Sequence, residues 1–385
     1  MEALKAGHGR RCITPPLGTA MMGYAGRTQG AQDVHDDLFA NAVALTDGHA
    51  SVGLLAYDLC LMDARLVEEV KGAVRQATEL EPAQVFVNAS HTHAGPALGS
   101  WHEKSEDKAY RRLVVQKGAE AMKDALEDAA PCTFSAGAAG LDIGCNRRER
   151  RADGTVWLGH NPGGQRLAEL TAWRLARRGK PRILLFSTPM HGTTLGQQNL
   201  SISAEWMGLA IRHIEKKSPR TRAVFLQGCG ADQDPYYSMK DGNRGSFGEA
   251  DAHGRAAAQA VAAALKHMRR LQPLPIRTVM RTVPLPGKED GSTALPLSLH
   301  GLRLGDAVLL GLGCEAFVEF ALFGRAISKA QETLILGYTD GSIGYLCTAD
   351  VFPEGGYEPQ TSRLAPRSEH LVKEAMQAML AELTQ

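Results

Sequence analysis

The chain has few cysteines for its length, and they are not spaced as in a structural zinc site. Its 385 residues contain seven cysteines, which are widely scattered and include no CxxC pair. The absence of paired cysteines excludes a structural zinc site of that type, and the odd number does not suggest a disulfide framework. We expect reduced thiols that are mostly buried as small hydrophobic side chains.

Long apolar runs and an excess of charge of either sign are also absent. No stretch approaches the roughly 18 apolar residues of a membrane span, and the N-terminal MEALKAGHGRRCITPP lacks the apolar core of a secretory signal. Lys plus Arg total 43 against 42 for Asp plus Glu, so the net charge gives no attraction to nucleic acid or anionic membranes. We therefore expect a cytoplasmic protein with a small-molecule partner, no nucleic-acid partner and no membrane insertion.

Repeats, low-complexity tracts and linker-like stretches are missing as well. Hydrophobic residues make up 44% of the chain and charged residues 22%, which are ordinary values for a globular protein. The length exceeds the usual limit for one hydrophobic core. We expect one large catalytic unit or two closely fused lobes, with room for a deep active site.

Short apolar segments alternate with amphipathic ones along the chain. Runs such as SVGLLAYD, QVFVNAS and RILLFST predict strands, whereas DARLVEEVKGAVRQATEL and the C-terminal SEHLVKEAMQAMLAELTQ predict helices. Residues 132–158 and 274–304 also show the pattern of strands and turns, which disfavours a purely parallel sheet. The predicted fold is α/β, with mixed β-sheets flanked by helices.

Nearly all polar residues suited to catalysis directly follow a predicted strand. They are His91 and His93 after QVFVNAS, His191 after RILLFSTPM, Asp232 and Asp234 after AVFLQG, Glu315 after AVLLGLGC, and Tyr338 and Tyr345 after LILG. In proteins with helices on sheet faces, ligands bind beyond the carboxyl ends of the strands. We expect these side chains to converge on one crevice.

The strongest single signal is SHTHAGP at residues 90–96. Two histidines one residue apart on an extended segment point to the same side, so they can present two imidazoles to one metal ion or substrate. A bare HxH is a structural pair about half the time, but the turn at Gly95 and Pro96 favours a loop around a site. Metallo-β-lactamases and amidohydrolases also carry HxH, yet the further residues that they need are not found here.

Three other segments carry weaker signals. In MHGTTLGQQNLSISAEWMG, His191 leaves a strand and precedes a polar loop typical of residues that support a metal ligand. Asp232 and Asp234 lie in the Gly-rich QGCGADQDP, where acids usually belong to the turn itself. Glu315 lies just before a predicted helix, where interaction with the helix dipole is the ordinary role.

Seven segments, in the same order along nearly the whole chain, resemble the neutral/alkaline, non-lysosomal ceramidase family. They are ITPP, NASHTHAGP, NRR at 146–148, MHGTTLGQQNLSISAEWMG, QGCGADQDP, GCEAF and GYLCTADVFPEGGYE. The resemblance implies a ceramidase-like catalytic domain over residues 1–385, without the family's C-terminal immunoglobulin-like domain. It also implies one catalytic zinc ion, whose activated water attacks an amide.

Specific roles follow from the same resemblance. It implies zinc ligands at His91, His191, Glu315 and Tyr345, with Tyr338 and Tyr357 as neighbouring alternatives to Tyr345. His93 would face the substrate and assist proton transfer or oxyanion stabilisation. Arg147 and Tyr357 would lie around the scissile carbonyl.

Two departures from the family bear on the substrate. Asp234 stands where the family's ceramidases carry a serine, which removes a serine-nucleophile route and leaves the acid to bind an amine, act as a base or hold the loop. Glu205 stands where relatives more often carry aspartate. With the shorter chain, these differences predict a smaller, more polar acyl substrate than ceramide.

The resulting hypothesis is a zinc-dependent hydrolase that cleaves the amide (N-acyl) bond of a small intracellular substrate. An esterase or lactonase with the same zinc site is the nearest alternative, because an ester demands less protonation of its leaving group. A nucleophilic Cys229 or Cys314 is a second, and a non-catalytic ligand-binding member of the family is a third.

Overall fold

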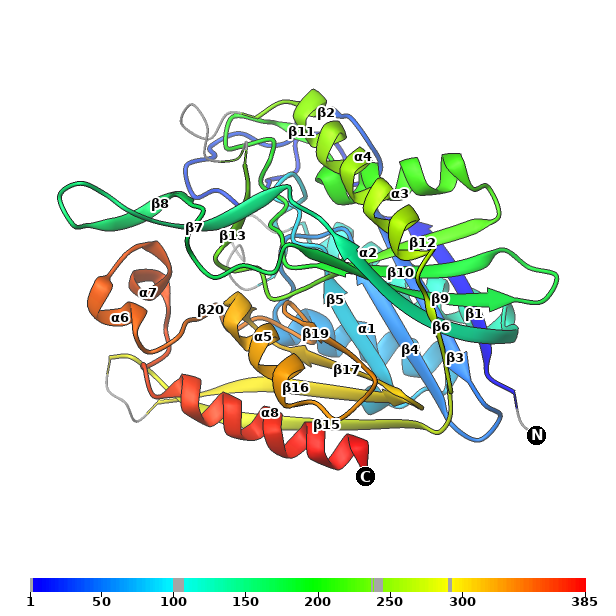
Figure 1. Cartoon of the computed structure of the whole chain (residues 1–385). Helices are drawn as coiled ribbons and strands as arrows, with labels where there is room; N and C mark the ends of the chain where they lie inside the picture. Colours follow the sequence, from blue (N-terminus) through cyan, green and yellow to red (C-terminus); the bar gives the residue numbers. More distant parts are fainter. Residues whose placement is uncertain (1–2, 100–106, 237, 239–244, 290–292) are drawn as a thin grey trace.

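A nine-stranded mixed sheet forms the centre of the computed structural model, which describes residues 3–99, 107–236, 238, 245–289 and 293–385 (Figure 1). In order across the sheet the strands are β12 (Thr221–Gln227), β10 (Arg182–Thr188), β9 (Glu169–Arg177), β6 (Ala130–Gly140), β1 (Lys5–Cys12), β3 (Phe39–Thr46), β4 (Ser51–Tyr57) and β5 (Val85–Ala89), with β14 (Arg269–Leu271) paired to β6. The pairs β10/β12 and β4/β5 are parallel and the other pairs are antiparallel. The predicted mixed sheet is confirmed.

A second sheet packs face to face against the first. Its strands are β15 (Ile276–Pro286), β16 (Ala294–Leu304), β17 (Ala307–Leu312) and β19 (Glu332–Leu336), of which β17 and β19 are parallel. Alternate side chains of β17 point to opposite faces, so Leu309 packs in the core between the sheets and Leu310 packs toward the outer helices. The apolar run of this strand is therefore buried on both sides.

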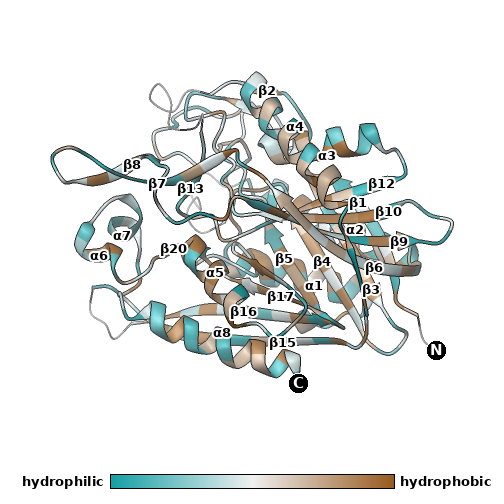
Figure 2. Cartoon of the chain, viewed as in Figure 1, coloured by the Kyte–Doolittle hydropathy of each residue, from teal (hydrophilic) through white to brown (hydrophobic). Residues whose placement is uncertain are grey.

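Helices cover the two outer faces. Four lie on the large sheet, namely α1 (Ala64–Thr78), α2 (Lys108–Glu127), α3 (Glu205–Lys217) and α4 (Phe247–Ala264), and two lie on the second sheet, namely α5 (Val318–Ile327) and α8 (Ser368–Thr384). Strands in the middle of the sheets, such as β4, β10 and β17, are largely brown with apolar residues, and the helices carry teal residues on their outer sides (Figure 2). The layers therefore run helix, sheet, sheet, helix. No helix within the described ranges is long and apolar enough to cross a membrane.

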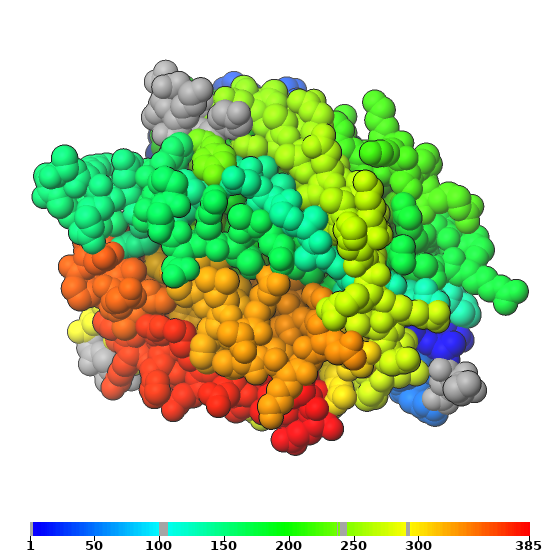
Figure 3. Space-filling view, in the orientation of Figure 1, coloured from blue at the N-terminus to red at the C-terminus, as the bar shows by residue number. Residues whose placement is uncertain are grey.

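Shorter elements surround one end of these layers. They are β2 (Asp33–Val34), β7 (Gly144–Arg150), β8 (Val156–Asn161), β11 (Ser201–Ile202), β13 (Gln233–Pro235), β18 (Glu315–Ala316), β20 (Tyr345–Leu346), η1 (Pro82–Gln84), α6 (Val351–Glu354) and α7 (Tyr357–Thr361). The β7–β8 hairpin and the α6–α7 segment lie together on one surface of the molecule (Figure 3). Trp157 of the hairpin meets Tyr357 of α7 there, with ring centroids 6.1 Å apart.

The buried amide of Asn88 joins the carboxyl ends of three strands. Its Oδ1 accepts from the backbone N–H of Gln227 at the end of β12 (2.9 Å), and its Nδ2 donates to the carbonyl of Gly337 after β19 (2.9 Å). Asn88 itself lies in β5, so β5, β12 and β19 end at one place. A buried amide with these partners is costly to replace, and the residues that follow the three strands are brought together.

Candidate metal centre

His91 occupies a strained backbone position just after β5. Its φ is 63°, in the left-handed region that a residue with a side chain rarely adopts. The backbone N–H of His91 donates to the carbonyl of Leu59 (2.9 Å), and its Nδ1 lies 2.8 Å from the carbonyl oxygen of Cys60. A proton on Nδ1 would be held by that carbonyl, which leaves the Nε2 lone pair free for a ligand.

The HxH segment is not a plain extended strand, as the sequence pattern had suggested, because of this turn at His91. The rings of His91 and His93 lie at 85° to each other. Their Nε2 atoms nevertheless approach to 3.1 Å, so both imidazoles face one point. The positive φ rotates His91 toward the interior while His93 continues the chain, and this achieves the convergence that the pattern predicted.

His191 is brought to the same point by pairing between two loops. Thr92 and Gly192 form a parallel bridge, and His93 N–H donates to the carbonyl of Gly192 (2.9 Å). His191 Nδ1 lies 2.6 Å from the carbonyl oxygen of Gly230, and Trp206 of α3 donates through Nε1 to the His191 carbonyl (2.8 Å). The Nε2 of His191 therefore also faces inward, as that of His91 does.

Glu315 supplies a carboxylate opposite the two histidines. It lies in β18, and its Oε2 is 3.4 Å from His91 Nε2 and 4.0 Å from His191 Nε2. This Oε2 is buried and accepts no hydrogen bond from any residue that the structure describes. The start of α5 is instead held by Asp232, whose Oδ1 accepts from Val318 N–H (2.9 Å). The helix-terminal role that position suggested for Glu315 thus belongs to Asp232.

Burial controls the charge of this cluster. The pKa of His91 is lowered to about 3 and that of His191 well below its usual value, in both cases chiefly by desolvation. Desolvation also raises the pKa of Glu315 to about 7. Neutral imidazole is the form that binds a metal ion, and a nearby cation would return the carboxyl group to its ionised form.

The donor set fits zinc. One ligand atom from each of His91, His191 and Glu315 lies within 4.8 Å of the others. Two imidazoles whose Nδ1 atoms face carbonyls, together with a buried carboxylate oxygen that lacks a partner, form the arrangement typical of a catalytic zinc site. Cys60, His91 and His93 form a second group within the same limit. The Cys60 Sγ lies 3.8 Å from His91 Nδ1, the nitrogen that already faces the Cys60 carbonyl, so this group does not share the free Nε2 of His91 with the thiol.

Two tyrosines adjoin the cluster and a third lies further out. Tyr345 pairs with Glu315 in the β18/β20 ladder, and its hydroxyl hydrogen bonds to the Glu315 carboxylate, which lowers the pKa of that carboxyl in opposition to burial. Tyr338 packs on His91 with ring centroids 4.2 Å apart, and its hydroxyl has no hydrogen-bond partner within the described ranges. Tyr357 lies further out, with its ring centroid 5.7 Å from that of Tyr345 and 5.8 Å from Arg147 Cζ.

Arg147 of β7 connects the metal cluster to its surroundings. Its Nη1 lies 3.3 Å from His191 Nε2, and its Nη2 donates to the hydroxyl of Tyr345 (3.3 Å). Its Nε donates to Glu358 Oε1 (2.7 Å), and Glu358 Oε2 accepts from Arg148 (2.9 Å). The guanidinium, 4% exposed as a residue, is therefore held in one orientation with two nitrogens toward the cluster.

Asp234 lies beside this arginine. Its Oδ1 is 3.4 Å from Arg147 Nη1 and accepts from Thr193 Oγ1 (3.3 Å). The same oxygen lies 3.6 Å from His191 Nδ1. Burial raises the pKa of Asp234 while Arg147 opposes that shift. Its contacts are those of a residue that orients an arginine and a metal-site histidine.

His93 lies at the edge of the cluster nearest the N-terminal loops. Tyr24 meets its ring edge-on, with centroids 5.1 Å apart, and Arg27 donates to the His93 carbonyl (2.7 Å). Gly23 has φ 109°, and a Cβ there would lie 2.6 Å from the imidazole. The close approach of the Gly23 backbone fixes where His93 can lie.

Glu205, Cys229 and Cys314, which the sequence analysis also singled out, have surroundings that indicate structural roles. Glu205 is buried, and its carboxylate accepts from the backbone N–H of Leu195 (2.6 Å) and of Trp206 (3.1 Å), so it shapes the loop after His191. Cys229 and Cys314 are fully buried, and burial raises the pKa of both thiols. A nucleophilic cysteine needs the opposite shift, so the geometry disfavours the cysteine alternative.

The sequence analysis did not identify Glu358, which holds Arg147 in place by accepting a hydrogen bond from its Nε. The signal was available, since this acid directly follows Tyr357 in GGYEP, but an isolated Glu after a tyrosine has no pattern that marks it as buried. Asp232 was likewise expected only to belong to its turn. Asp232 links the start of α5 to Asn146, which donates to its Oδ2 (2.7 Å).

No family model matches the sequence. The solved structures that are similar to the whole chain include two ceramidases. One is a ceramidase complexed with C2, with a TM-score of 0.85 and 14% identity, and this chain covers 76% of it. The other is the neutral ceramidase from Pseudomonas aeruginosa, with a TM-score of 0.84, 15% identity and 75% of that chain covered. The resemblance predicted from the seven segments is confirmed at the level of structure, and the chain has the ceramidase fold.

Proposed function

We propose that the protein is a zinc-dependent hydrolase that cleaves the amide bond of a small acyl substrate. The observation that carries the proposal is the convergence of His91, His191 and Glu315 on one point, with the guanidinium of Arg147 against it. His91, His191, Glu315 and Tyr345 would hold the ion. When bound, zinc would lower the pKa of a water molecule and polarise the substrate carbonyl.

The side chains around that point have the chemistry of acyl transfer. Arg147 offers two N–H groups beside the cluster, and these would stabilise negative charge that develops on the carbonyl oxygen. Glu358 and Asp234 neutralise this arginine and keep it in place before substrate arrives. A donor fixed in advance loses no reorganisation energy during the reaction.

Proton transfer to the leaving amine would fall to His93. Its Nε2 faces the same point as that of His91, and desolvation lowers its pKa well below the usual value. A neutral imidazole can accept a proton during attack and return it to the departing nitrogen. An amide needs this step more than an ester does, which favours amide cleavage over the esterase or lactonase alternative.

The experiment compares matched substrates on one preparation. Purified protein is assayed on N-acetyl and N-butanoyl anilides, the corresponding phenyl esters and γ-butyrolactone, before and after chelation and after addition of zinc. We expect anilide hydrolysis that is lost on chelation and restored by zinc. Hydrolysis that survives chelation but is abolished by thiol alkylation would overturn the proposal in favour of cysteine catalysis.

A further inference from the structure

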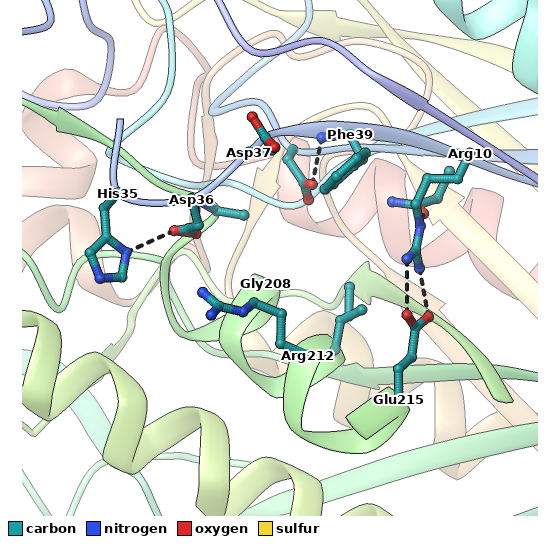
Figure 4. Close-up of a pocket in the computed structure, with 12 residues that line it drawn as sticks. Arg10, His35, Asp36, Asp37, Phe39, Gly208, Arg212 and Glu215 are labelled. Carbon is teal, nitrogen blue, oxygen red and sulfur yellow. Dashed lines mark hydrogen bonds and ion pairs between the residues drawn. The ribbon is translucent and has the colours of Figure 1, made fainter. Parts of the chain in front are cut away.

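A cavity of about 420 Å³ lies apart from the metal centre, between α3 and the ends of β1 and β3 (Figure 4). Arg10 and Glu215 line one side, and His35 and Asp36 line the other. Apolar atoms of Phe39 and α3 complete the wall. The cavity is large enough for a small organic molecule.

One ion pair in the cavity is already complete. Arg10 Nη2 and Nη1 lie 2.8 and 3.1 Å from the two carboxylate oxygens of Glu215, and Figure 4 shows the two groups directly opposed. The guanidinium also donates to Ala223 O (3.0 Å) and Asn41 Oδ1 (2.5 Å). Arg10 and Glu215 therefore contribute no net charge toward a ligand.

Asp58 and Asp36 have no Arg or Lys within ion-pair distance among the described residues. Asp58 is 6% exposed and accepts from Phe39 N–H (2.9 Å), but no cation lies within ion-pair distance of it in the described part of the chain. Desolvation accordingly raises the pKa of Asp58 to about 7. Asp36, with 7% of its side chain exposed, accepts from Ser203 Oγ and Ala204 N–H and lies 3.2 Å from His35 Nδ1.

An unused donor also faces the cavity. Asn41 is 2% exposed, and its Oδ1 is occupied by Arg10. Its Nδ2 donates to no residue that the structure describes, although the residue lines the cavity. This N–H₂ is open to the cavity and is not sealed inside the protein, so a ligand oxygen can accept a hydrogen bond from it.

The balance of free charge in the cavity is negative. Asp36, Asp37 and Asp58 carry three negative charges when ionised, Arg212 carries one positive charge and a protonated His35 would add a second, so at least one negative charge remains. Arg212 is exposed at the mouth and makes no ion pair or hydrogen bond within the described ranges. A cationic ligand is the one that this balance attracts.

The cavity wall also contacts the supports of the metal centre. Ser203 donates through Oγ to Asp36 (2.6 Å), and its carbonyl accepts from Thr92 Oγ1 (2.7 Å). Thr92 lies between His91 and His93. A molecule bound at Asp36 therefore lies two hydrogen bonds from the segment that carries both histidines.

We propose that this cavity is a second binding site, distinct from the metal centre, for a small amine that carries a hydroxyl or other acceptor oxygen. The ammonium group would lie between Asp58 and Asp36, and the oxygen would accept from Asn41 Nδ2. Phe39 and the small Gly208 leave an apolar space for the carbon chain. This proposal does not depend on the hydrolase activity.

Calorimetric titration of the full-length, metal-loaded protein tests it, with 4-amino-1-butanol as the probe and 1,4-butanediol and 4-hydroxybutyrate as neutral and anionic controls. We expect the amine alone to bind. Asp58→Asn should weaken binding at least about tenfold, because the ammonium then loses a charge-assisted hydrogen bond. Asp33→Asn, which removes the same charge from an exposed residue outside the cavity, should leave binding unchanged.

Two further variants make the result decisive. Arg212→Glu alters an exposed, unpaired side chain and should tighten amine binding several-fold, because the local field becomes more negative. His191→Ala should retain amine binding, since it alters only the metal centre. The proposal is overturned if the amine does not bind, if neither Asp58→Asn nor Arg212→Glu changes its affinity, if hydroxybutyrate binds instead, or if binding is lost in His191→Ala.

Discussion

Replacing Glu358 with Gln removes the carboxylate that bridges two buried arginines. Glu358 is 1% exposed, and its oxygens lie 2.7 Å from Arg147 Nε and 2.9 Å from Arg148 Nη1. Removing one partner of a buried ion pair typically costs about 3–5 kcal/mol, because the other charge stays desolvated. Arg147 retains Asp234 at 3.4 Å, so we expect about 3 kcal/mol, the lower end of that range.

Urea unfolding followed by tryptophan fluorescence measures this change, since the chain has four tryptophans. Glu354→Gln is the matched control, because Glu354 also binds Arg148 (3.3 Å) but its side chain is 38% exposed. A partly exposed pair contributes less than about 1 kcal/mol. Equal losses of unfolding free energy in the two variants would refute the buried network.

The same substitution should affect catalysis beyond its effect on stability. Without Glu358 the guanidinium of Arg147 is free to turn toward Asp234 and away from the metal cluster. Loss of one oxyanion donor lowers kcat by about 100-fold or more. Without urea, where the variant is fully folded, we expect kcat/KM of Glu358→Gln to fall by about 100-fold or more. The kcat/KM of Glu354→Gln should stay near the wild-type value.

Two further predictions concern the position of a histidine and the pH dependence of stability. Gly23→Ala places a Cβ 2.6 Å from the His93 ring and should lower kcat/KM at least about tenfold. The control is Gly18→Ala, which is also at positive φ (85°) but has open space around it, so it carries similar backbone strain and should leave activity unchanged. Equal activity of the two variants would contradict the contact between Gly23 and His93. The pKa of Asp58 is raised from 3.8 to about 7 on folding, so the folded state binds its proton more tightly and wild-type stability falls as pH rises from about 4 to about 7. Asp58→Asn lacks this loss, and its unfolding free energy relative to wild type should increase between pH 5 and pH 8 by an amount on the order of 2–3 kcal/mol; a constant difference would refute the raised pKa.

Much of the fold was readable because the burial pattern is local. The run AVLLGL in β17 is apolar at every position, and the structure buries both of its faces between a sheet and a helix layer. The pattern predicted strand and helix types, and the strands expected in residues 132–158 and 274–304, which disfavoured a purely parallel sheet, are present in the structure. The packing of the two sheets face to face was not predictable, because the sequence of a strand does not indicate which other sheet or helix it will pack against.

The convergence of His91, His191 and Glu315 followed from their positions after strands. The backbone features that bring these residues together could not be predicted. The turn at His91 depends on a positive φ, which is usually predicted from a glycine, and no glycine is present at this position. The ends of β5, β12 and β19 are joined by the side-chain amide of Asn88, which belongs to no sequence motif. Such features arise from long-range hydrogen bonds, for which one sequence contains no periodic signal.

Among the tyrosines, spacing alone left three alternatives near the metal. The structure brings Tyr345 against the Glu315 carboxylate and packs Tyr338 on His91 at 33°, whereas Tyr357 contacts Tyr345 and Arg147. The cavity at Arg10 and Asp58 gave no sequence signal, because its walls come from two distant segments, residues 10–58 and 204–215. Only the folded chain brings these charges together.

Metal content tests the central claim most directly. Elemental analysis of purified wild-type protein, beside His191→Ala and Glu315→Gln, should find about one zinc per chain in the wild type and none in either variant, with amide hydrolysis lost in both. His213→Ala, a half-buried histidine that pairs with Asp251 on the surface (2.6 Å), should keep both metal and activity. A wild-type protein without metal, or variants that hydrolyse as the wild type does, would contradict the account.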